Sequence, residues 1–122
     1  MQINIKASGA VMLTEEVRSF VEDKVGKLQK ILNQNDTTLM TDVEIGTVSG
    51  SRTGDLFRAE LNITFAGGGV RAEASRETLH AAIDEAVAEA RGEIRRTRTK
   101  HRDLIRRGAA SVKEFFKRFG GY

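Results

Sequence analysis

Hydrophobic and polar residues alternate along four short stretches of the chain, and each alternation predicts a strand with one buried face. The stretches are residues 2–7, 42–48, 56–65 and 70–74. The third, LFRAELNITF, is the clearest, because every second position from its second residue onward is apolar. Four strands with one apolar and one polar side each are therefore expected.

Two longer stretches carry apolar residues at the spacing of a helix. The first begins after Thr14, a plausible N-cap with acidic residues in the turn that follows, and runs to about Leu32. The second begins after Ser75, which we expect to cap it, and its apolar face runs from Leu79 to Ile94. A basic segment follows, through which the second helix continues to Arg107 if it is unbroken.

The order strand, helix, three strands, helix predicts an α+β fold of β-α-β-β-β-α type. The first two strands, joined through a helix, should be parallel, and the other two connections should be antiparallel. We expect a two-layer sandwich, in which both helices cover one face of a four-stranded mixed sheet. Residues 1–107 should form this domain, and residues 108–122 a basic and aromatic tail.

Charge is distributed unevenly along the chain. Residues 1–90 are slightly acidic, whereas residues 91–107 carry eight basic side chains against two acidic ones. At about 100° per residue five arginines share one helix face over roughly 22 Å. We call these five the arginine stripe: Arg91, Arg95, Arg98, Arg102 and Arg106.

An arginine row on one side favours nucleic acid as the partner, because every phosphate contact releases condensed counterions. The simpler alternative is a solvated helix end, which most charge runs are. In the first helix Lys24, Lys27 and Lys30 recur every third residue. Lys24 should pack its aliphatic stem and project its ammonium, although a solvated flank explains these three lysines equally well.

An enzyme is not expected. The two histidines, His80 and His101, would lie about 31 Å apart along a straight helix. There is no cysteine, and no cluster of carboxylates has metal-ligand spacing, so we expect neither a metal nor a cofactor. The glycine run 67–69 lacks the lysine of a phosphate-binding loop and reads as a turn.

Charged residues in the predicted strands also fit a structural role. Glu44, Glu60 and Glu73 should share the outer face of the sheet with Arg58 and Arg71. Cross-strand ion pairs explain this set better than acid–base catalysis does.

The chain carries no apolar run near 18 residues, and its first residues lack the pattern of a secretory signal. The absence of cysteine suits a reducing compartment. We therefore expect a cytoplasmic protein that does not contact a membrane.

RNA binding through the sheet would require exposed aromatic residues in the strands. Phe57 and Phe65 instead share the parity of the apolar set and should point inward. Binding should therefore use the helices, and the order of elements resembles that of the double-stranded RNA-binding domain. A general double-stranded RNA-binding protein is accordingly one possible function.

Three segments closely resemble the ribosome hibernation family, which includes protein Y and the hibernation-promoting factors. They are LTEEVRSFVEDKVGKLQK, GDLFRAELNITF and RAEASRETLHAAIDEAVAEA. The Ala-Ala-Ile-Asp at 81–84, followed by a basic second half of the same helix, is the most specific piece. The likeness covers residues 1 to about 107, and residues 106–115 resemble the start of the protein Y tail.

This resemblance implies a translation inhibitor of idle ribosomes, made under stress or in stationary phase. Such proteins dock on the small ribosomal subunit over the decoding and peptidyl sites, where they exclude tRNA and mRNA. Their rRNA contacts come from basic residues of both helices. By position these correspond to Lys24, Lys27, Lys30, Arg95, Arg96, Arg98, Lys100 and Arg102. Arg91 and Arg106 of the stripe, together with His101, complete the expected RNA-binding set; no DNA binding is expected.

The sequence departs from the family pattern at two positions. The family's Glu-Arg-Gln-Leu reads Arg91-Gly92-Glu93-Ile94 here, so that glycine replaces the customary arginine and Arg91 could substitute for it. His80 stands where tyrosine is common. Long members also carry a second domain that pairs ribosomes. This chain ends before one, so we expect silencing without ribosome dimerisation and a monomer off the ribosome.

The tail, GAASVKEFFKRFGGY, leaves two alternatives open. Phe115, Phe116 and Phe119 could form a short helix that packs back on the domain, or they could become ordered on a partner. A protein-interaction module acting through this cluster is the third possible function.

Overall fold

A computed structural model describes residues 1–33, 35–48, 54 and 56–107, and for residues 98–107 it describes the course of the backbone alone. The expectations for the tail therefore lie outside the described residues. The elements are β1 (Gln2–Ala7), α1 (Glu15–Gly26), the 3₁₀ helix η1 (Lys27–Ile31), β2 (Met40–Thr47), β3 (Phe57–Phe65), β4 (Gly68–Arg76) and α2 (Leu79–Arg107).

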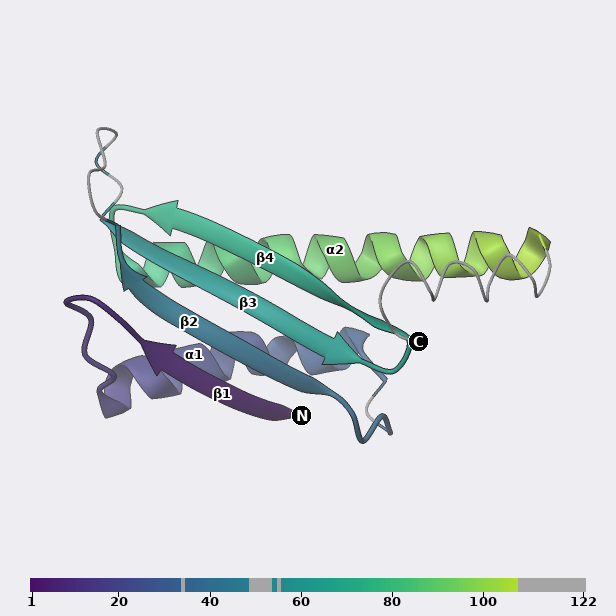
Figure 1. Ribbon diagram of the computed structural model, residues 1–122, viewed down its shortest axis with the longest axis horizontal. Coiled ribbons are helices and arrows are strands. Elements are labelled where there is room, and N and C mark those ends of the chain that lie inside the picture. The colour runs from purple at the N-terminus through teal and green to yellow at the C-terminus, as the bar shows by residue number, and fades with distance from the viewer. Residues whose placement is uncertain (34, 49–53, 55, 108–122) are drawn as a thin grey trace.

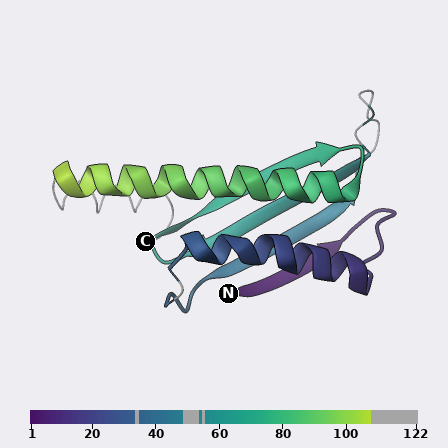
Figure 2. The same ribbon diagram turned by 180° about the vertical axis from the view of Figure 1, so that it is seen from behind.

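The sheet has the predicted topology. Its strands lie in the order β1-β2-β3-β4, with β1 parallel to β2 and the other two pairs antiparallel. Figures 1 and 2 show α1 and α2 side by side on one face of this sheet. The two-layer α+β sandwich is therefore confirmed.

The core lies between the sheet and the two helices. Phe57 and Phe65 are partly buried against it, which confirms that the aromatic residues of β3 point inward. Alanines on α2 allow this helix to approach the strands closely. The buried apolar residues of the sheet are Val43, Ile45, Ala59, Leu61, Ile63, Ala72 and Ala74, and those of the helices are Val21, Val25, Leu28, Ala82, Ile83, Ala86, Val87, Ala90 and Ile94.

The start of the second helix differs from the prediction. Ser75 does not cap it, because strand pairing continues through this residue and places it opposite Arg58. The cap is Thr78, whose Oγ1 accepts a hydrogen bond of 3.1 Å from the backbone N–H of Ala81. Ser75 is still part of β4, so the helix begins only where pairing with β3 has ended.

The first helix starts as predicted but changes its geometry near its end. Thr14 Oγ1 accepts from the N–H of Val17 at 3.2 Å, which confirms the cap. From Lys27 to Ile31 the chain tightens into a 3₁₀ helix. Gly26 stands at the junction, where its low helix propensity favours such a change.

The second helix is unbroken to Arg107, as expected. Its 29 residues span about 43 Å, and its last turns project past the end of the sheet (Figure 1). Ile94 is the last buried apolar residue of the described side chains. The basic half of α2 is therefore carried by a helix that is anchored through its apolar half.

The outer face of the sheet holds the predicted ion pairs. Arg58 bridges Glu60 and Glu73, the latter at 2.9 Å, and Arg71 lies 3.2 Å from Glu60. Glu60 is only 8% exposed, and the Asn62 amide donates to its second oxygen at 2.9 Å. Asn62 and then the two guanidinium groups lower the pKa of the Glu60 carboxyl, and Arg58 lowers that of Glu73.

These shifted carboxyl groups predict a loss of stability in acid. Because the folded pKa values of Glu60 and Glu73 lie below their ordinary 4.5, the network stabilises the fold above that pH and loses this effect as the pH falls through the folded values. Urea unfolding from neutral pH to about pH 3 measures the decline.

The double variant Glu60→Gln/Glu73→Gln provides the control. It should be less stable at neutral pH, and its stability should fall less in acid. Asp36, whose pKa the backbone N–H of Ala66 lowers, is present in the wild type and in the double variant, so it contributes equally to the two pH profiles. Identical pH profiles of the wild type and the variant would contradict the prediction.

Candidate nucleic-acid interface

Two contacts on the exposed side hold α1 against α2. The rings of Phe20 and His80 stack with centroids 4.0 Å apart and planes 12° apart. One turn further along both helices, Lys24 Nζ lies 3.3 Å from Asp84 Oδ1 and 5.5 Å from the centre of the Phe20 ring. Since each pair advances by four residues on both helices, α1 and α2 run in the same direction.

The arginine stripe continues the side of α2 that meets α1. At about 100° per residue, His80, Asp84 and Ala88 lie within about 60° of Arg91 and precede it at intervals of four, four and three residues. The helix surface that contacts α1 therefore continues, beyond Ala88, to Arg91 and Arg95. This continuity places the start of the stripe beside the end of the first helix.

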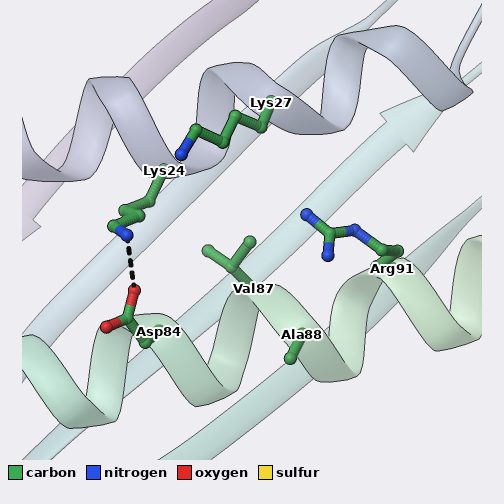
Figure 3. Close-up of a pocket in the computed structure, with 6 residues that line it drawn as sticks. All are labelled: Lys24, Lys27, Asp84, Val87, Ala88 and Arg91. Atoms are coloured by element: carbon green, nitrogen blue, oxygen red, sulfur yellow. Dashed lines mark ion pairs between the residues drawn. The ribbon is translucent and has the colours of Figure 1, made fainter.

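Between the two helices lies a cavity of about 240 Å³. Figure 3 shows the head groups of Lys27 and Arg91 on the two sides of this space, with the Lys24–Asp84 ion pair at one end. Val87 and Ala88 complete the lining. Side chains from α1, η1 and α2 thus converge on a single groove, which we call the interhelical groove.

The predicted RNA-binding residues differ in their exposure to solvent. Lys27, Lys30, Arg95 and Arg96 are exposed, and Arg91 is partly exposed. For five others only the helical backbone is described: Arg98, Lys100, His101, Arg102 and Arg106.

Two of the predicted cations have carboxylate partners. The sequence predicts that Lys24 projects its ammonium, but in the structure this ammonium forms an ion pair with Asp84. Arg96 pairs with Glu93 one turn before it. Both partners lie on α2, so this helix compensates part of the positive charge itself.

Lys27, Lys30 and Arg91 make no ion pair with any residue that the structure describes. Arg58 and Arg71 on the outer face of the sheet do, and so does Arg76 at the end of β4, which pairs with Glu85 of α2. Two of these uncompensated cations, Lys27 and Arg91, line the groove where η1 faces α2.

The contacts of Asp84 and His80 were not predicted from the sequence. His80 is exposed and stacks on Phe20. The partnership of Lys24 and Asp84 joins residues sixty positions apart. A signal did exist, because His80 and Asp84 continue the spacing of the arginine stripe toward the start of the helix.

The described residues offer little for other chemistry. They contain no group of three or more histidine, aspartate or glutamate side chains placed to hold a metal ion. None of the helices in the described ranges has the length and apolar content that crossing a bilayer requires.

The family model for the sigma 54 modulation protein / S30EA ribosomal protein matches residues 3–102. The chain belongs to this family. The match confirms the resemblance seen in the sequence, and it makes the chain a ribosome-associated protein. It covers both helices and all four strands, including α2 as far as Arg102.

Two solved structures are similar to this S30EA family member. The N-terminal domain of Thermus thermophilus Protein Y aligns with a TM-score of 0.65 and 29% identity, over 79% of this chain and 98% of that one. A ribosomal subunit interface protein from Coxiella burnetii aligns with a TM-score of 0.64 over 81% of this chain and 99% of that one. Its identity is 14%, so this second likeness concerns the fold alone.

Gly92 lies inside α2 without a packing reason. A Cβ there would meet the Arg96 guanidinium at 3.6 Å, an ordinary contact. We therefore expect Gly92→Ala to raise the free energy of unfolding by about 1 kcal/mol, as measured in urea.

Gly69→Ala is the matched control for this substitution. A Cβ at Gly69 would lie 2.8 Å from the backbone carbonyl oxygen of Ile63, so the same change should lower the stability. Destabilisation by Gly92→Ala would show that the helix needs glycine at this position.

Proposed function

We propose that this protein inhibits translation by binding the small ribosomal subunit near the decoding and peptidyl sites. The arginine stripe and the lysines of α1 and η1 contact rRNA phosphates there. The bound domain blocks tRNA and mRNA and stabilises idle ribosomes. It acts by occupying the site, without catalysis or a cofactor, in the cytoplasm during stress or stationary phase.

The observation that carries this proposal is the unequal compensation of charge on the two faces of the molecule. On the sheet, Arg58 and Arg71 are bound by Glu60 and Glu73, so this face offers few cations to a polyanion. On the helical layer, Lys27, Lys30 and Arg91 have no such partners among the described residues. Cations held without a carboxylate partner are available to phosphates.

The shape of the domain supports the same assignment. Helix α2 projects beyond the sheet, so its basic end can enter a concave surface that the sandwich itself cannot enter (Figure 1). Folded RNA is recognised chiefly by shape and backbone contacts. The family membership supplies the ribosome as the source of that RNA.

Charge reversal in the stripe tests the proposal. The triple variant Arg95→Glu/Arg98→Glu/Arg102→Glu should bind small subunits at least about a hundredfold more weakly. It should also fail to inhibit translation in a purified system. Co-sedimentation with small subunits measures the binding.

The control carries charge reversals away from the stripe, at Lys6 in β1 and Arg18 in α1. Lys6→Glu/Arg18→Glu should bind nearly as the wild type does, and circular dichroism should show both variants folded. Equal loss in the two variants would mean that net charge alone, and not the stripe, determines binding.

The salt dependence of binding tests the contribution of single cations. Lys30→Gln should reduce the slope of log K against log salt by about one. The same titrations with isolated duplex RNA distinguish a ribosome-specific protein from a general duplex binder. Comparable affinity for both at equal salt would contradict the ribosome as the specific target.

A further inference from the structure

The interhelical groove differs from the rest of the basic surface because its cations come from separate elements and converge. Lys24 comes from α1, Lys27 from η1 and Arg91 from α2. The buried Val87 and the small Ala88 leave space between them. These three side chains border one open groove between the helices (Figure 3).

The charges around the groove do not balance. Three cations face a single carboxylate, that of Asp84, and this carboxylate is already bound to Lys24. Lys27 and Arg91 are left without an ion pair among the described residues. Like charges held near one another by the fold repel, and an anion between them relieves that repulsion.

The volume limits what the anion can be. At about 240 Å³ the groove is smaller than the roughly 300 Å³ at which pockets for drug-sized ligands begin. A guanidinium on one side and an ammonium on the other suit the tetrahedral oxygens of a phosphate. A phosphate group fits within this volume.

We propose that the interhelical groove binds one phosphate group, with Lys27 and Arg91 as the donors and Asp84 as the residue that restrains its affinity. In the ribosome complex the occupant is a backbone phosphate of rRNA, and to this extent the inference rests on the proposed function. The donor set itself would equally accept a free phosphate.

Asp84 has two opposing effects in this site. Its carboxylate holds Lys24 at 3.3 Å, beside the Phe20 ring, and so orders one side of the groove. The same negative charge repels an incoming anion. Asparagine in its place keeps an oxygen that can accept from Lys24 while it removes the repulsion, so Asp84→Asn should strengthen phosphate binding.

Nuclear magnetic resonance titration of the full chain tests the site without the ribosome. The probes are inorganic phosphate and the dinucleotide UpU, which carries one phosphodiester. The readouts are the amide shifts of Val87 and Ala88 and the Nε shift of Arg91. We expect saturable changes with a dissociation constant of about 1 mM.

The variants identify the donors. Lys27→Gln and Arg91→Gln should each weaken binding about tenfold, and Asp84→Asn should strengthen it about threefold. Lys6→Gln on the outer face of the sheet is the matched control and should leave binding unchanged. Unperturbed amide spectra away from the groove show that each variant is folded.

Both probes binding in the groove supports the site, and their relative affinity distinguishes an RNA backbone phosphate from a free one. Shifts that do not saturate, or that survive in both Lys27→Gln and Arg91→Gln, overturn the inference even if the wild type still co-sediments with ribosomes. Saturable binding that these variants lose upholds the groove even if co-sedimentation fails, so the two proposals are tested separately.

Discussion

The packing of one face of α2 against the sheet is the contact on which the rest of the structure depends. Small residues such as Ala82, Ala86 and Ala90 bring the helix axis close to the strands, and Ile94 ends the buried stretch. Burial of this face supplies the free energy that holds the helix. The basic half then extends from this fixed base past the end of the sheet (Figure 1).

The two faces of the sandwich compensate their charges differently. On the outer face of the sheet, cross-strand neighbours place Glu60 beside Arg58 and Arg71, and the network neutralises itself. On the helical face, α1 and α2 run in the same direction and bring Lys27 and Arg91 to opposite sides of one groove. The fold thereby concentrates uncompensated positive charge on the helical face, which is the face that we propose contacts rRNA.

The contact between the helices also restrains that charge. Lys24 was expected to project freely, yet Asp84 binds it and the Phe20 ring lies beneath it. An ion pair at this partly exposed position adds little stability. Its main consequence is to orient one ammonium and to place a carboxylate at the edge of a basic groove.

Periodicity in the sequence was sufficient to predict the strands, both helices and their order, because alternation and helical spacing are local properties. It also predicted that Phe57 and Phe65 point inward, and it placed the five arginines of the stripe on a single helix. Tertiary structure decided the rest. Pairing with β3 displaced the helix cap from Ser75 to Thr78. The ion pair between Lys24 and Asp84 joins residues sixty positions apart in the sequence. This ion pair and the interhelical groove depend on how the two helices pack on a common sheet, which no local pattern specifies.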